Sequence, residues 1–267
     1  MDLNLIYLVY GLAYFSMGIV VWVRIKPLVD NRIATVFRWL AAFGVIHGIH
    51  VLIEMFVIMG HTAVTVLYVS TLFVALSFAA LLQFGIELIG ITKKRSRIIH
   101  LVPAILFFLW FLFYLGTLFY DEGVRLAYIL SMYTLGLPGT LLTAYSLIRK
   151  RKEIAENPRI TEKLFLAGVF FAFYGVLSVI VPESDFFPAS ILNYSWFSGL
   201  VGLPIQLFNT IFTVAITYFI VMSLNVFDVL EKRMLSEQLE KKTNILKESE
   251  KRFRTLAETA ADAIIII

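Results

Sequence analysis

The sequence predicts an all-α membrane protein: a seven-transmembrane-helix bundle with its N-terminus outside, whose last helix continues into a cytoplasmic, coiled-coil-like helix. Three observations predict this fold. The 267 residues are 60% hydrophobic and only 16% charged, whereas soluble proteins are nearer half apolar and a quarter charged. Several stretches are apolar over the roughly 20 residues that a helix needs to cross a bilayer. The last of them passes into charged sequence without a glycine or proline that would end a helix.

The predicted spans follow one another with short connections. The last is longer than a bilayer needs, so we expect it to tilt, or its first part to lie at the membrane interface. In order, the predicted spans are Leu3–Val23, Ile33–Met59, Val64–Ile91, Ile98–Phe119, Val124–Ile148, Leu164–Val181 and Ile191–Leu224.

The orientation follows from the basic residues, which gather in the connections after the first, third and fifth spans and in the tail. Of the 23 lysines and arginines, only Arg125 lies on the other side, and Arg38 lies within a span. Because lysine and arginine remain in cytoplasmic connections, we predict an outer N-terminus and a cytoplasmic C-terminus. The start of the chain lacks the basic region of a signal peptide, so the first span is expected to remain in the mature protein.

Composition and loop length exclude several kinds of site. The chain has no cysteine, so it can form no disulfide, thiolate nucleophile or cysteine-ligated metal centre. The outer connections are short, and the longest covers about residues 182–190. We therefore expect any stimulus to reach the bundle, the lipid or the rim, since no extracellular domain is predicted to bind a large ligand.

Ionisable side chains in the second span form the main candidate site. His47, His50 and Glu54 are spaced by three and four residues, which places them on one helix face. Charged groups within a bilayer are costly and usually face the bundle interior. Imidazole and carboxylate groups can ligate a divalent metal, and imidazole can ligate haem. His61 is about 21 Å along the helix from His47, too far to share an ion with it.

Three interpretations of this face remain open. It could be a sensing pocket with a metal or haem, a pH-responsive pair of histidines, or a hydrogen-bonded polar seam between helices. No cofactor is required by the sequence, and the cofactor stays unknown.

Two further features of the second and third spans are expected to be structural. Gly44 and Gly48 form a small-xxx-small pair that lets two helix backbones approach closely, so the second span is expected to be central. Arg38 and Glu87 lie at similar depth, and an ion pair between them would avoid an unpaired charge in the membrane.

The seventh span carries a second polar face, which begins one turn after a proline. Proline within a helix removes a backbone hydrogen bond and kinks it, so a kink is predicted there and another at Pro138. Packing is the preferred role of these residues, with bending as the alternative. The residues are Pro204, Gln206, Asn209, Thr213 and Thr217.

Beyond Leu224 the sequence is amphipathic. Leu235, Leu239, Leu246, Phe253 and Leu256 fit a heptad frame in which Lys242 and Ser249 are flaws. Such a helix is a weak coiled coil that could join two copies of the chain. The alternative is a solvated amphipathic helix on a monomer.

The end of the chain resembles the entry to a PAS domain. Phe253-Arg254-Thr255-Leu256-Ala257-Glu258, followed by Asp262-Ala263-Ile264-Ile265, matches a helix with a Phe-Arg-x-Leu-x-Glu core that precedes a first apolar strand. The resemblance covers about twenty residues. It implies a longer protein cut just inside its next domain.

The resemblance divides the chain into residues 1–224, a seven-helix sensor region; 225–252, a linker helix; and 253–267, the start of a PAS domain. This order of regions resembles that of sensor histidine kinases, and sometimes of diguanylate cyclases. Such proteins lie in the inner membrane of prokaryotes. The resemblance implies a sensory input module, a homodimer, a response regulator as partner of the output domain and no nucleic-acid partner. No catalytic residues are predicted within the chain. The alternatives are a small transporter or channel with a regulatory tail, or a haem- or metal-binding membrane protein.

Overall fold

The structure, a computed structural model, describes residues 3–25, 31–60, 64–90, 97–120, 122–154 and 157–265. The described residues are predominantly helical, and the extended pairing among them is an isolated bridge between Val181 and Asn193. They form two compact units, Met1–Val226 and Phe227–Ile267. The first unit contains seven helices that are long and apolar enough to cross a membrane. This confirms the predicted multi-pass helical bundle.

The helices of the first unit agree with the predicted spans within a few residues, apart from the last two. The sixth span is Pro158–Leu177 and the seventh Ile205–Asn225. The basic connections 26–30 and 91–96, on which the predicted orientation depends, lie outside the described residues, as does His61. In chain order the elements are α1 (Leu3–Ile25), α2 (Asn31–Ile58), α3 (Val64–Gly90), α4 (Arg97–Thr117), α5 (Gly123–Ser131), η1 (Met132–Gly136), α6 (Leu137–Ile154), α7 (Pro158–Leu177), α8 (Tyr194–Val201) and α9 (Ile205–Ile265).

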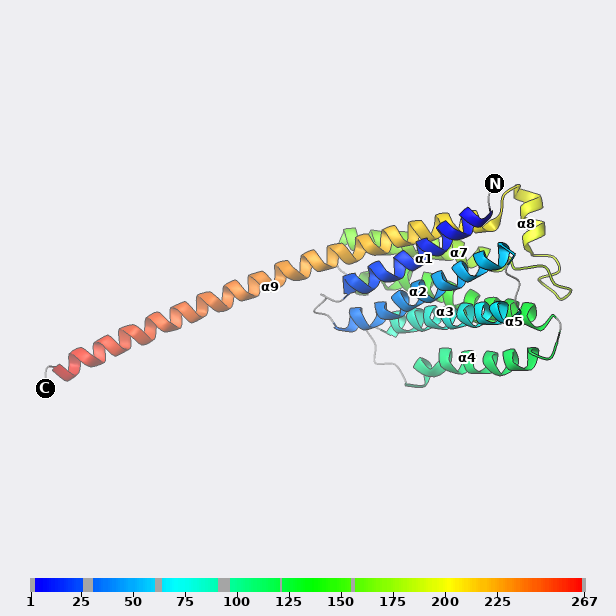
Figure 1. Cartoon of the computed structure of the whole chain (residues 1–267). Helices are drawn as coiled ribbons and strands as arrows, with labels where there is room; N and C mark the ends of the chain where they lie inside the picture. The colour runs from blue at the N-terminus through cyan, green and yellow to red at the C-terminus, as the bar shows by residue number, and fades with distance from the viewer. Residues whose placement is uncertain are drawn as a thin grey trace. The chain divides into compact units, whose positions relative to one another are not determined.

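The bundle is organised around α3, which packs against α2, α4, α5 and α6 (Figure 1). The predicted central helix, α2, lies between α1 and α3. Its contact with α1 depends on glycine, as the Gly44–Gly48 spacing predicted. A Cβ atom added at Gly44 would lie 2.7 Å from the backbone nitrogen of Gly18, and one added at Gly48 would lie 2.6 Å from that of Phe15. Only glycine allows the two backbones to approach this closely.

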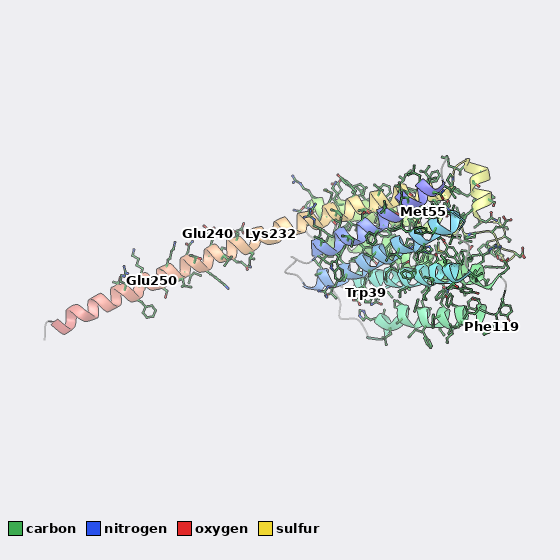
Figure 2. The ribbon with its side chains drawn as sticks, in the orientation of Figure 1. Trp39, Met55, Phe119, Lys232, Glu240 and Glu250 are labelled. Carbon is green, nitrogen blue, oxygen red and sulfur yellow. The ribbon has the colours of Figure 1, made fainter. Side chains whose placement is uncertain are left out.

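Large apolar side chains cover the outside of the bundle, including Trp39 and Phe119 (Figure 2). The fourth span is the least buried of the seven, and it presents Phe108 and Leu112 among other exposed apolar residues. Monomeric soluble proteins rarely expose apolar surface this extensive. The surface is suited to contact with lipid tails.

The fifth span contains the predicted irregularity near Pro138. Its helix changes to a π-helical turn over Met132–Gly136 and returns to α-helix at Leu137. Proline has no N–H to donate to the preceding turn, and π-turns are a common cause of local bends. The threonines on either side bond back to the helix: the Thr134 hydroxyl donates to the Leu130 carbonyl and the Thr140 hydroxyl to that of Gly136.

The predicted kink at Pro204 is wrong, because Pro204 lies outside the helix. The short helix α8 ends at Gly202, which has a φ of 74° and donates its N–H to the Ser198 carbonyl. This left-handed conformation is available to glycine at little cost and commonly ends helices. Pro204 then immediately precedes the first residue of α9, a position where its missing N–H costs nothing. The apolar run from Ile191 is therefore a loop, a separate helix and a span.

The backbone of α9 remains helical from Ile205 to Ile265, including residues 224–229, where the unit boundary falls. The end of the chain differs from the prediction: Asp262–Ile265 is helical, where the PAS resemblance implied a strand. A lone strand has no neighbour for its backbone hydrogen bonds, whereas an existing helix extends by one bond per added residue. Ile266 and Ile267 lie outside the described residues.

Candidate functional site

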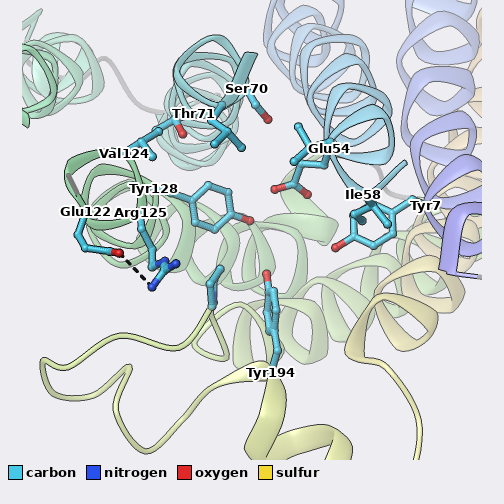
Figure 3. Close-up of a pocket in the computed structure, with 13 residues that line it drawn as sticks. Tyr7, Glu54, Ile58, Ser70, Thr71, Glu122, Val124, Arg125, Tyr128 and Tyr194 are labelled. Atoms are coloured by element: carbon cyan, nitrogen blue, oxygen red, sulfur yellow. Dashed lines mark ion pairs between the residues drawn. The ribbon is translucent and has the colours of Figure 1, made fainter. Parts of the chain in front are cut away.

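A pocket of about 410 Å³ opens at the end of the bundle where α1 begins and α8 lies (Figures 1 and 3). This volume is within the range of small-molecule sites. We call it the Glu54 pocket. Its polar lining residues are Tyr7, Glu54, Ser70, Thr71, Tyr128 and Tyr194. Its apolar lining residues are Val57, Ile58, Leu67, Val124 and Pro182. Its rim carries Glu122 and Arg125, which form an ion pair at 3.0 Å.

Glu54 is the acidic residue inside this pocket. Its side chain is 28% exposed, and the hydroxyl groups of Tyr7, Tyr128 and Tyr194 are directed into the space beside its carboxyl group (Figure 3). The Tyr128 hydroxyl points toward the Glu54 carboxyl group. The ion pairs among the described residues include no lysine or arginine bonded to Glu54.

Tyr194 reaches the pocket because backbone hydrogen bonds join the two ends of the loop before α8. The Tyr194 N–H donates to the Val181 carbonyl at 3.0 Å, and the Asn193 side chain accepts from the Trp196 N–H at 2.9 Å. The second bond is a standard helix N-cap, so Tyr194 is the first residue of a capped helix. Burial raises the pKa of the Tyr194 phenol well above its ordinary value, which keeps the hydroxyl neutral.

The two histidines form hydrogen bonds with serines of α3. His50 Nδ1 lies 3.0 Å from the Ser70 carbonyl oxygen, which can only accept, so Nδ1 carries the proton. The Ser77 hydroxyl donates to the Val74 carbonyl and therefore accepts from His47 Nδ1 at 2.9 Å. These contacts fit the predicted polar seam between helices.

The remaining ring nitrogens face different partners. His47 Nε2 lies 3.5 Å from the Tyr174 hydroxyl, whereas His50 Nε2 lies 3.6 Å from a carboxylate oxygen of Glu54. With its proton on Nδ1, a neutral His50 presents only a lone pair to Glu54 and gives it no hydrogen bond. The three predicted residues are thus neighbours, but their nitrogen and oxygen atoms do not converge on one point.

The arrangement of His47, His50 and Glu54 is poorly suited to binding a metal ion. No group of three or more His, Asp or Glu side chains within the described ranges is placed to hold a metal ion. Divalent metals in proteins take three or four protein ligands at about 2 Å. The histidines of the candidate set are instead bonded to serines of α3, and Glu54 points into the pocket.

A second, inner cavity of about 20 Å³, the size of a single water molecule, lies next to the Glu54 pocket. The two share Tyr7, Glu54, Tyr128 and Tyr194. The inner cavity is also lined by both histidines, Tyr10, Tyr174, Gln206 and Asn209.

The polar face predicted in the seventh span is partly at this cavity. Gln206 donates to the Tyr7 hydroxyl at 2.9 Å, and the Asn209 side-chain oxygen is buried without a hydrogen-bond partner among the described residues. Thr213 and Thr217 instead bond back to the carbonyls of Asn209 and Thr213. Of this face, Gln206 and Asn209 therefore belong to the site.

The predicted Arg38–Glu87 ion pair is not formed. Arg38 is exposed, and Glu87 contacts His100 Nδ1 at 2.9 Å and accepts from Gln83 at 2.8 Å. The sequence places Arg38 and Glu87 at one depth, but depth does not fix which way each helix is turned.

The tyrosines are the site residues that the sequence argument missed. Tyr7 and Tyr10, which line the inner cavity, and Tyr14, which packs against His47, are spaced by three and four residues, as the ionisable residues of α2 are, and all three are buried. This spacing was an available signal. Tyr128, Tyr174 and Tyr194 come from three other helices and carry no such signal.

Comparison of the chain with protein-family models, with curated proteins and with solved structures gives no match. The function must therefore be argued from the geometry of the site and of the helix that leaves it.

Proposed function

We propose that the chain is a membrane-embedded sensory input module that relays a stimulus through α9. One observation carries the proposal. The helix that lines the inner cavity with Gln206 and Asn209 continues without a break in its helical backbone to Ile265. It contains no glycine or proline, so no residue in it favours a flexible joint.

The relay would start at the hydrogen bond between Tyr7 and Gln206. Tyr7 lines both the Glu54 pocket and the inner cavity, and Gln206 is in the first turn of α9. A ligand that moves Tyr7 changes the partner of Gln206. Such a ligand shifts the module only if it binds two packings of the bundle with different affinity. Phe170 and Phe173 of α7, whose rings lie 5.7 to 6.1 Å from those of Phe212 and Phe219, form the other contact that two packings would rearrange.

The remaining parts of the proposal come from the sequence. The basic residues place the N-terminus and the Glu54 pocket outside and the tail in the cytoplasm. The heptad residues pair two copies of the chain, and the PAS-like segment leads to an output domain, a histidine kinase that phosphorylates a response regulator. The membrane is then the inner membrane of a prokaryote. This proposal includes no nucleic-acid partner.

The relay can be tested without knowing the stimulus. The chain would be fused through Phe253, in helical register, to the catalytic core of a dimeric histidine kinase, and autophosphorylation measured in membrane vesicles. Gln206→Leu removes the bond to Tyr7, and a hydrogen bond contributes about 1 kcal/mol. We therefore expect kinase activity to change about fivefold. The matched control is Ser198→Ala, since Ser198 is exposed on α8. Equal activity in the parent fusion and both variants would refute the relay.

Pairing of two copies predicts a pattern of cysteine cross-links along α9. The chain has no cysteine, so each introduced thiol is the sole one. Leu239→Cys and Leu246→Cys are expected to form disulfide-linked dimers in membranes, because both lie on the predicted seam and are exposed in the single chain. Glu237→Cys and Asn244→Cys, on the opposite face, are the controls. Equal cross-linking at all four positions would show that the seam is not the contact.

A further inference from the structure

We propose that the Glu54 pocket binds a small organic primary ammonium ion with an apolar body. The inference deepens the proposed function and rests on it, since it assigns the chemical class of the stimulus. It is carried by the acidic residue in the pocket, by the direction of the tyrosine hydroxyls and by the apolar residues that line the pocket with them.

The charge of the pocket selects a cation. At the rim, Glu122 and Arg125 neutralise each other at 3.0 Å. Inside, Glu54 has no lysine or arginine partner among the ion pairs of the described residues, and the Nε2 of a neutral His50 faces it with a lone pair. A carboxyl group within a membrane span is costly to ionise without a cation beside it. A bound cation would favour the ionised form of Glu54 and supply its countercharge, whereas an anion would find none.

The hydroxyl groups select a cation that can donate hydrogen bonds. Those of Tyr7, Tyr128 and Tyr194 are directed into the space beside the Glu54 carboxyl group (Figure 3). The oxygens of Tyr128 and Tyr194 can each accept a hydrogen bond, whereas the oxygen of Tyr7 already accepts one from Gln206. A primary ammonium group has three N–H donors, which suits one carboxylate and neighbouring phenol oxygens. A quaternary ammonium group has none.

The shape of the pocket selects an organic body rather than a bare ion. Val57, Ile58, Leu67 and Val124 add apolar surface to the lining of the pocket, and the volume of about 410 Å³ is far larger than one ion. Small-molecule sites are mostly apolar with a few placed polar groups. Since no three acidic or histidine side chains in the described parts of the chain can hold a metal, an inorganic divalent cation is the poorer occupant.

The test is calorimetric titration of the purified full chain in nanodiscs of uncharged phosphatidylcholine. The probe is 2-phenylethylamine, compared with its neutral isostere 2-phenylethanol and its N,N,N-trimethyl analogue. We expect the amine to bind at least 30-fold more tightly than either, because only the amine is both charged and a three-fold donor. Equal binding of amine and alcohol, or tighter binding of the trimethyl analogue, would overturn the assignment.

Substitutions in the pocket test whether the amine binds beside Glu54. Glu54→Gln keeps the size of the side chain and removes its charge, and is expected to weaken amine binding about 100-fold. Tyr194→Phe is expected to weaken it about fivefold. The control is Glu162→Gln, the same change at an exposed residue of α7 that does not line the pocket, and it is expected to weaken binding less than twofold. Undiminished binding in Glu54→Gln, or an equal loss in Glu162→Gln, would refute the site. Should Glu54→Gln not fold, Tyr194→Phe and the three-ligand comparison still decide.

The titration needs no output domain, so this inference and the relay fail separately. Amine binding with no response of the kinase fusion would keep the site and refute the relay. A fusion that responds to Gln206→Leu, together with a chain that binds no amine, would keep the relay and refute the ligand.

Discussion

Gly44→Ala is expected to lower the free energy of unfolding of the bundle by about 3 kcal/mol, the upper part of the range for overpacked sites. The new Cβ would lie 2.7 Å from the nitrogen and 2.8 Å from the Cα of Gly18, and 2.9 Å from the Tyr14 carbonyl oxygen. These are backbone atoms, so no side chain can rotate away and α1 must move from α2. Unfolding in mixed micelles with increasing dodecyl sulfate, followed by tryptophan fluorescence, would measure the loss.

Gly116→Ala is the matched control. It makes the same chemical change in a helix of the same bundle, but a Cβ at Gly116 meets nothing within 4 Å. Alanine is favoured over glycine in a helix by about 0.5–1 kcal/mol, so this variant should be as stable as the parent or slightly more so. Equal losses in the two variants would show that the α1–α2 contact is not what Gly44 provides.

Glu237→Pro is expected to uncouple the kinase fusion from the membrane bundle. Glu237 is exposed in α9, so proline there changes the helix backbone and little else. Proline inside a helix removes a hydrogen bond and clashes with the preceding turn, at a cost of about 3 kcal/mol. We expect the roughly fivefold effect of Gln206→Leu on autophosphorylation to disappear in the Glu237→Pro background.

The control for that experiment is Glu237→Ala, which removes the same carboxylate and keeps the helix. It should leave the response to Gln206→Leu intact. A response that survives proline would mean that the signal reaches the output domain by a route other than the α9 backbone, which contradicts the proposed relay.

The seven spans could be predicted because a bilayer makes apolar length decisive: a spanning segment must satisfy its backbone hydrogen bonds within itself. The boundary before the last span could not be predicted by this rule. Residues 191–204 carry no charged side chain that would separate them from the span, and the stop signal is the pair Gly202 and Pro204, of which Pro204 was interpreted as a kink. In the structure, Gly202 is left-handed and α9 begins after Pro204.

The candidate site was predicted in its ionisable part only. The spacing of His47, His50 and Glu54 fixes one face of one helix, and the structure places that face against α3. Their partners depend on how neighbouring helices are rotated about their own axes. Periodicity within a single helix carries no information on that rotation, which is why Ser70 and Ser77 were not identified and Arg38 was paired with Glu87.

The break at Gly202 has a mechanical consequence. Tyr194 on α8 and Gln206 on α9 are on opposite sides of a three-residue connector, Gly202–Pro204. The flexible part of the backbone is therefore this connector, which precedes the span, because Ile205–Asn225 contains no glycine or proline that would favour bending. A displacement of α8 is expected to pull or twist the first turn of the span, and the span is expected to move as a rigid body in response.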